Sequence, residues 1–202
     1  MKIKINFFAV MLFLSIIISC SYYALIPLLA ATLHELGHIL SAKICGVRLN
    51  NFNVGILGAR LGMGNAVCSY GNEIIICASG PMMNFISAYF TFMISKLFCV
   101  NNEISDIFIL SSVSLGIINI LPIRSLDGGR IISAVISRIG NVRSAEIILD
   151  ILSFITLFTL WCISLYLLLK NASSLSLFVF SVSIFASIFL EDEKYASKAT
   201  KF

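Results

Sequence analysis

Apolar runs long enough to cross a lipid bilayer make up most of this 202-residue chain. We recognise six, at about residues 5–20, 22–42, 74–98, 105–122, 147–169 and 173–190. A helix needs roughly 20 apolar residues to span the hydrocarbon core, where it satisfies its backbone groups internally. The sequence therefore predicts an all-α polytopic membrane protein with about six transmembrane helices.

Composition predicts one membrane-embedded domain that covers residues 1–202. Hydrophobic residues make up 59% of the chain and charged residues only 12%. The segments between the apolar runs are too short to build a sizeable soluble core. We therefore expect any soluble partner domain to come from another chain.

The basic residues predict how the chain is oriented. With the N-terminus in the cytoplasm, two of the fourteen Lys and Arg residues, Lys96 and Lys170, fall outside, and the others fall inside. Cytoplasmic loops carry such an excess of positive charge. We expect a multi-pass protein of the cell membrane with both termini in the cytoplasm. Because the basic residues are spread over four inner segments, the net charge of +4 indicates no nucleic-acid partner.

Residues 1–20 fit two interpretations. They read as an uncleaved first helix, or as a lipoprotein signal that ends at a lipidated Cys20. The charge bias favours the uncleaved helix. Both interpretations leave the second apolar run crossing from outside to inside.

The second apolar run contains the sequence HELGH, from His34 to His38, and its ionisable side chains are confined to that segment. On a helix, histidines four residues apart lie on one face and can bind one Zn²⁺, and Glu35 is placed to handle a water proton. Ionisable groups within lipid are costly and usually line a functional site. The placement therefore favours zinc hydrolase chemistry over a chance match.

A catalytic zinc site needs a third protein ligand and an open position for water. Asp127 is the best candidate, because it follows the inner end of the fourth run and so reaches the same depth as His34 and His38. Pro122 and the Gly128-Gly129 pair should interrupt the helix there and let the backbone bend toward a buried centre. The alternative is an aspartate that caps a helix.

Three motifs in order resemble the site-2 proteases, the zinc metalloproteases of peptidase family M50 that cleave peptide bonds within or near membranes. They are HELGH at 34–38, SGPMMN at 79–84, and NILP at 119–122 followed by LDGGR at 126–130. The resemblance covers roughly residues 5–145 and is strongest to small bacterial members. It implies a three-helix catalytic core at about 22–135, with peripheral helices at about 5–20, 147–169 and 173–190.

The resemblance also implies residue roles. Zinc would be bound by His34, His38 and Asp127, Glu35 would act as general acid and base, and Asn119 would support the reaction. One departure concerns the loop before the LDG sequence, where members often have a proline and this chain has Arg124-Ser125. We expect no inserted PDZ-like domain and no C-terminal nucleotide-sensing domain to regulate this polypeptide.

We therefore expect an intramembrane zinc metalloprotease that cuts membrane-spanning or membrane-associated substrates near the cytosolic face, in regulated proteolysis. Its partners would be the lipid bilayer, a membrane protein or peptide substrate, and a separate regulatory membrane protein. Two alternatives stay open. An inactive relative would only bind a membrane partner, and a metal-ion transporter would need polar groups along several spans.

Two features outside the zinc motif bear on substrate binding. Residues 47–70 contain short apolar runs broken by glycines, which predicts a small interfacial β-hairpin that could align an unwound substrate by strand addition, or else a plain surface loop. The amide of Asn119 could hold substrate backbone or an oxyanion, or form an interhelical hydrogen bond. For Asn84 we expect a structural role.

Overall fold

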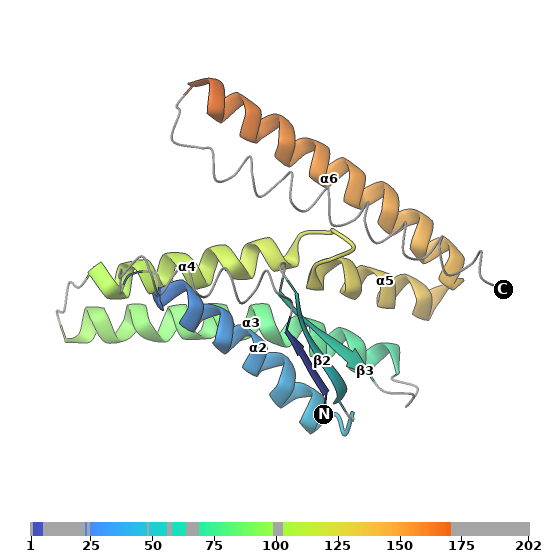
Figure 1. Ribbon diagram of the computed structural model, residues 1–202, viewed down its shortest axis with the longest axis horizontal. Helices are drawn as coiled ribbons and strands as arrows, with labels where there is room; N and C mark the ends of the chain where they lie inside the picture. Colours follow the sequence, from blue (N-terminus) through green and yellow to red (C-terminus); the bar gives the residue numbers. More distant parts are fainter. Residues whose placement is uncertain are drawn as a thin grey trace. The chain divides into compact units, whose positions relative to one another are not determined.

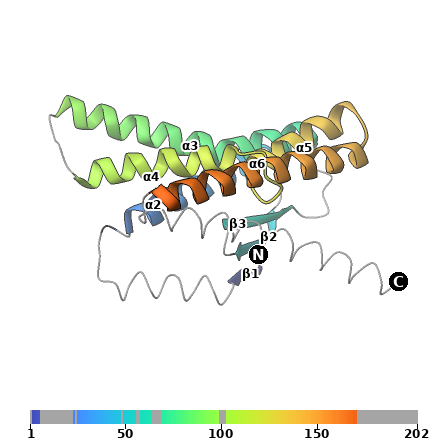
Figure 2. The ribbon, with the colours of Figure 1, turned by 90° about the horizontal axis from the view of Figure 1, so that it is seen from above.

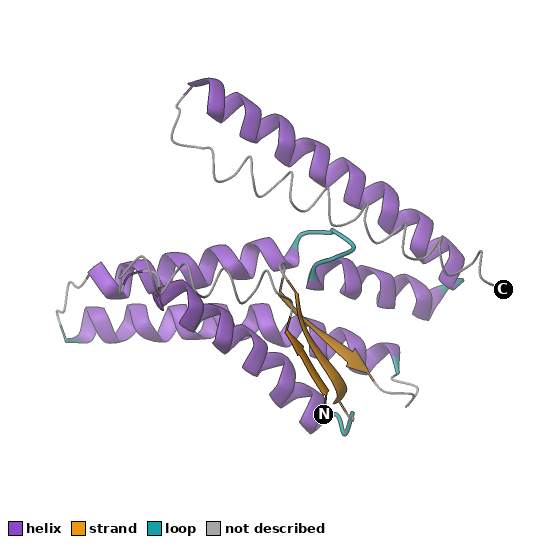
Figure 3. Ribbon diagram, viewed as in Figure 1, coloured by secondary structure: helices purple, strands orange, loops and turns teal. Residues whose placement is uncertain are grey.

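The computed structural model describes residues 2–5, 23, 25–47, 49–55, 58–63, 69–98 and 103–170. It divides into two compact units, Met1–Ile120 and Leu121–Phe202. Most described residues are helical (Figures 1 and 3). The elements, in order, are β1 (Lys2–Ile5), α2 (Leu25–Ile44), β2 (Leu49–Gly55), β3 (Gly58–Met63), α3 (Tyr70–Leu97), α4 (Glu103–Ile120), α5 (Asp127–Ile139) and α6 (Val142–Lys170).

Four of the described helices, α2, α3, α4 and α6, are long and apolar enough to cross a membrane. They coincide with the predicted runs at 22–42, 74–98, 105–122 and 147–169. The predicted sixth run lies outside the described residues, and so does the first apart from Ile5, which ends β1. The expectation of a multi-pass helical membrane protein is confirmed, whereas the count of six spans stays a prediction.

In the first unit, α2, α3 and α4 pack against one another (Figures 1 and 2). Close to the N-terminal ends of α2 and α4, the side chains of Ile26, Ala30 and Phe108 form a buried apolar cluster. The Tyr23 hydroxyl donates a hydrogen bond of 2.9 Å to a carboxylate oxygen of Glu103. These contacts join the beginning of α2 to the beginning of α4, although the two helices are far apart in sequence.

Small residues set the distances between these helices. A Cβ atom added to Gly37 of α2 would lie 2.6 Å from the Ser79 carbonyl oxygen of α3, and one added to Gly116 of α4 would lie 2.9 Å from the Phe85 ring. Both distances are shorter than a carbon atom tolerates. In a bilayer, helices associate by close van der Waals contact, which small residues at the interface permit.

Helix α2 ends at a glycine that turns the chain into the sheet. Gly46 has a φ of +68°, which glycine adopts without steric cost. The Val47 amide donates to the Ala42 carbonyl at 2.9 Å and the Gly46 amide to the Lys43 carbonyl at 3.2 Å. This pair of bonds is the Schellman motif, which satisfies the last carbonyls of a helix.

The sheet has the order β1-β2-β3. Strand β2 pairs antiparallel with β3, with Phe52 opposite Leu61, and parallel with β1, with Phe52 opposite Ile3. The two strands β2 and β3 fall in the segment where a hairpin is expected, and their location at a membrane surface stays a prediction. Strand β2 lies between the other two, so β3 forms one edge of the sheet and β1 forms the opposite edge.

In the second unit, α5 packs against α6. The expectation that Gly128-Gly129 interrupts a helix is wrong. Asp127, Gly128 and Gly129 form the first turn of α5, and the break in helical structure is the segment 121–126 before them. The N-cap of α5 is Leu126, so Asp127 does not occupy the capping position considered for it.

We predict that Gly37→Ala weakens the packing of α2 on α3. The added methyl group overlaps a backbone carbonyl that cannot rotate away, so the substitution should cost roughly 1–3 kcal/mol. Gly71→Ala is the matched control, because its Cβ would meet the nearest atom at 3.8 Å and alanine favours a helix. Thermal unfolding in detergent measures both variants. Equal stability of the two would contradict close packing at Gly37.

Candidate metal centre

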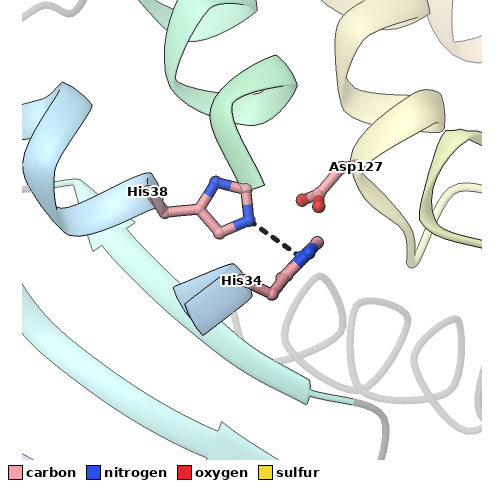
Figure 4. Close-up of side chains that lie close together, drawn as sticks. All are labelled: His34, His38 and Asp127. Atoms are coloured by element: carbon pink, nitrogen blue, oxygen red, sulfur yellow. Dashed lines mark hydrogen bonds between the residues drawn. The ribbon is translucent and has the colours of Figure 1, made fainter. Parts of the chain in front are cut away.

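The two histidines of α2 point toward each other in a buried position. His34 and His38 are 5% and 4% exposed, and their Nε2 atoms are 3.1 Å apart (Figure 4). Two Zn–N bonds of about 2.0–2.1 Å at a tetrahedral angle hold nitrogen atoms at nearly this separation. The four-residue spacing of the sequence motif thus places two imidazole nitrogens as a zinc ion requires.

The backbone of α3 fixes the orientation and the proton of His38. Its Nδ1 donates to the Ile76 carbonyl oxygen at 2.7 Å, and a carbonyl can only accept, so Nδ1 carries the proton. In the neutral imidazole, Nε2 is then a bare lone pair directed at His34. A bond of this kind to the second ring nitrogen is the usual support of a metal-binding histidine.

Serine hydroxyls and a glycine complete this contact between α2 and α3. Ser79 donates to the same Ile76 carbonyl at 2.6 Å, and its Oγ lies 2.7 Å from the Oγ of Ser41 on α2. A Cβ atom on Gly80 would overlap His38 Nε2 and lie 2.9 Å from His34 Cε1. The α3 backbone can therefore approach both imidazoles only because residue 80 is glycine.

Asn84 of α3 holds the other histidine. Its side chain is fully buried, and its Nδ2 lies 3.1 Å from His34 Nδ1. With the amide in this orientation, Nδ2 donates to Nδ1, and the proton of His34 lies on Nε2, directed at the lone pair of His38. Asn84 Oδ1 is buried and has no hydrogen-bond partner among the described residues.

A metal bound to both Nε2 atoms requires the other tautomer of His34, with its proton on Nδ1. A half-turn of the Asn84 amide brings Oδ1 to Nδ1 as the acceptor of that proton. The turn breaks no hydrogen bond of Oδ1, since Oδ1 has none in the present orientation. Asn84 can thus serve both tautomers of His34, and the buried site fits a metal ion.

The two predicted carboxylates occupy different helices. Glu35, next to His34 on α2, is partly buried, and its Oε2 atom is buried completely. Asp127 is the first residue of α5 and is partly buried. Asp127 offers one carboxylate oxygen as a possible ligand atom, as His34 and His38 each offer one ring nitrogen.

Asn119 lies in the last turn of α4, one residue before its end. Its Nδ2 donates to the Leu115 carbonyl of the same helix at 3.0 Å, which uses one of the two N–H groups of the amide. Among the residues that the structure describes, Asn119 forms no hydrogen bond to another helix. The second N–H stays available to another acceptor.

The contribution of α3 to the site was only partly predicted from the sequence. Asn84 is expected to have a structural role, and it contacts His34 directly. Gly80 belongs to the SGPMMN motif, and its observed contribution is room for the imidazoles. A usable signal was the four-residue spacing of Gly80 and Asn84, which places them on one face of a helix.

Comparison with known proteins relates the chain to a family of peptidases. The model of peptidase family M50 matches residues 22–105 and 100–163. Zinc metalloprotease MJ0392 from Methanocaldococcus jannaschii is 29% identical over 196 residues, which are 94% of this chain and 55% of that protein. Stage IV sporulation protein FB from Bacillus subtilis is 25% identical over 164 residues, which are 78% of this chain and 56% of that protein. The chain thus spans about half the length of the curated relatives it matches.

A solved structure shares the fold. The site-2 protease from Methanocaldococcus jannaschii superimposes with a TM-score of 0.61 at 23% identity, covering 91% of this chain and 87% of that one. The family model matches more than half of the chain, and the chain belongs to peptidase family M50, the site-2 protease family.

We predict that Asn84 sets the zinc affinity of the site through His34. Asn84→Leu removes the acceptor for the Nδ1 proton and should weaken zinc binding by about 10–100-fold, as loss of an outer-sphere partner does. Asn84→Asp keeps an acceptor and should bind zinc at least as tightly as the unmodified protein. Chelator competition in detergent measures the three dissociation constants.

Ser112→Ala is the control for loss of a buried polar group. Ser112 lies on α4, is fully buried, and its Oγ has no hydrogen-bond partner among the described residues. The substitution should leave zinc affinity unchanged. If Asn84→Leu also left it unchanged, the bond to His34 would have no part in metal binding.

Proposed function

We propose that the chain is an intramembrane zinc metalloprotease that hydrolyses peptide bonds of membrane-spanning or membrane-associated substrates. The observation that carries the proposal is the buried histidine pair, with Nε2 atoms 3.1 Å apart and the His38 proton held on Nδ1 by a backbone carbonyl. Glu35 lies beside this pair on the same apolar helix. A buried, oriented imidazole pair next to a carboxylate is suited to metal-assisted hydrolysis.

His34, His38 and Asp127 would hold the ion in this proposal. Their two imidazole nitrogens and one carboxylate oxygen are the donor set of a catalytic zinc site with one position left for water. Bound zinc supplies Lewis-acid activation of that water and polarises the scissile carbonyl. The chemistry of the three side chains, each of which offers one ligand atom, supports this assignment.

Glu35 is the proposed general acid and base. Its carboxylate takes the proton of the attacking water and returns it to the leaving amine. Asn119 is the proposed substrate-binding residue, and its second N–H can donate to the substrate carbonyl oxygen as negative charge develops there. The partly buried position of both side chains keeps these hydrogen bonds away from bulk water.

We further propose that cleavage occurs near the cytosolic face, with both termini in the cytoplasm, as the distribution of Lys and Arg supports. The partners would be the bilayer, a membrane protein or peptide substrate, and a separate regulatory membrane protein in regulated proteolysis. An inactive, partner-binding relative is the main alternative. It has less support, because His34, Glu35, His38 and Asp127 are all present.

We predict that Glu35→Gln abolishes proteolysis and leaves zinc binding intact, because the base contributes about 10²–10⁴-fold to the rate and is not a ligand. The protein is reconstituted in liposomes with a panel of membrane-tethered peptides, and new termini are identified by mass spectrometry. Zinc content is measured on the same samples. Identical new termini with both proteins, or none with either, would favour the inactive relative.

We also propose that substrate adds as a strand at the edge of the sheet beside β3. A protease needs an extended substrate, because helical peptide bonds are shielded, and an open strand edge supplies backbone partners for it. Support comes from the sheet order, which makes β2 central and leaves β3 with one strand neighbour among the described elements.

We predict that a proline on β3 slows cleavage without loss of zinc. Neighbouring residues of a strand direct their N–H groups to opposite sides, so one of the pair Arg60→Pro and Leu61→Pro removes a donor from the open edge. Cleavage of a membrane-tethered peptide and zinc content are measured for both. Lys4→Pro on β1 is the control for the opposite edge. Slower cleavage with Lys4→Pro alone would contradict binding at β3.

A further inference from the structure

Helix α6, outside the predicted catalytic core, is bonded to the segment 121–126 that leads into Asp127. Ser153 accepts a hydrogen bond from the Arg124 amide, and Asp150 forms an ion pair with the Arg124 guanidinium. We call Ser153 and the Arg124–Asp150 pair the loop anchor. We propose that the loop anchor positions Asp127 for metal binding, an inference that rests on the proposed role of Asp127 as a zinc ligand.

The segment 121–126 is a tight turn that packs onto the helix it introduces. The Ile123 amide donates to the Leu121 carbonyl at 2.7 Å, and the Leu126 amide donates to the Ile123 carbonyl at 2.9 Å. A Cβ atom on Gly129 would overlap the Ile123 carbonyl oxygen. Glycine at 129 therefore lets the first turn of α5, which carries Asp127, lie directly against this backbone.

Ser153 satisfies backbone groups that the turn leaves without helical partners. Its Oγ accepts from the Arg124 amide at 3.0 Å, and its hydroxyl is directed at the Pro122 carbonyl oxygen 3.4 Å away. Non-helical backbone in an apolar setting is tolerated only where other groups satisfy it. A single hydroxyl on α6 thus holds the turn at two points.

Ser153 lies on the buried face of α6. Ala145, Leu149, Ser153 and Leu157 follow at four-residue intervals and are all buried, so they form one buried face of the helix. Ser153 is the polar member of this face and is 4% exposed. A polar group in such a place requires a hydrogen-bonded partner, which the turn provides.

The ion pair adds a second, weaker link. The Arg124 Nη1 atom lies 2.8 Å from Asp150 Oδ1, with side-chain exposures of 36% and 53%. Asp150 lies three residues before Ser153, on the same side of α6. Exposed ion pairs contribute little energy. We therefore expect Ser153 to have the larger effect on the position of Asp127, and the ion pair to fix the direction of the Arg124 side chain.

The identity of residue 124 also bears on the loop anchor. A proline at position 124 would have no N–H and could not donate to Ser153. Here the Arg124 amide makes that bond, and its side chain makes the ion pair. The turn is thus stabilised from α6 instead of by the restricted φ of a proline.

The test is a double-mutant cycle on zinc affinity, measured in full-length protein by chelator competition. Ser153→Ala should raise the zinc dissociation constant by about 10-fold, the lower end for loss of an outer-sphere support. In the Asp127→Ala background, the same substitution should have no further effect, because Ser153 acts through Asp127. A purely structural role would change stability without this dependence on Asp127.

Ser164→Ala is the matched control. Ser164 is buried on the same helix, and its hydroxyl donates to the Trp161 carbonyl within α6, so its loss should leave zinc affinity unchanged. The spectrum of the Co²⁺-substituted protein gives an independent readout, since Ser153→Ala should alter the coordination bands and Ser164→Ala should not.

The outcomes separate the two proposals. If Asp127→Ala weakens zinc binding and Ser153→Ala does not, the loop anchor is overturned and the proposed ligand set stands. If Ser153→Ala weakens binding by the same factor with and without Asp127, the anchor acts elsewhere and the inference is wrong. If Asp127→Ala leaves zinc affinity unchanged, both proposals fail.

Discussion

The hydrogen bond from His38 Nδ1 to the Ile76 carbonyl is the interaction on which the rest of the site depends. It fixes the ring plane and the tautomer, and so leaves Nε2 as a lone pair toward His34. The bond can form only if α3 lies close to α2, which Gly37 and Gly80 permit. Close contact between the backbones of α2 and α3 is therefore required both for the packing of these helices and for the orientation of the histidines.

Several buried polar groups in the described part of this apolar chain have hydrogen-bond partners on neighbouring segments. The imidazoles bond to backbone and to Asn84, Ser79 bonds to the backbone of its own helix, and Ser153 bonds to a turn. An unsatisfied polar group in hydrocarbon costs several kcal/mol, so each of these side chains constrains where its neighbour can lie. The orientation of the histidine pair follows from this requirement.

The sequence predicted a large part of this arrangement, and the physical reason is spacing. Helical periodicity places His34 and His38 on one face, and apolar length identifies four membrane-length helices. The sequence did not predict the contacts of Asn84 or the helical turn that α5 forms at Gly128-Gly129. The contact of Asn84 depends on which face of α3 meets α2. The position of the first turn of α5 depends on a hydrogen bond between Arg124 and Ser153, which lie 29 positions apart. Local sequence patterns predict neither contact.

We propose that two imidazoles and one carboxylate bind a single zinc ion in this chain. X-ray absorption at the zinc edge, on protein purified in detergent with one equivalent of zinc, tests it directly. This ligand set predicts a four-coordinate ion with only nitrogen and oxygen neighbours at about 2.0–2.1 Å and multiple scattering from two imidazole rings. A sulfur neighbour at about 2.3 Å, or scattering from fewer than two imidazoles, would contradict it.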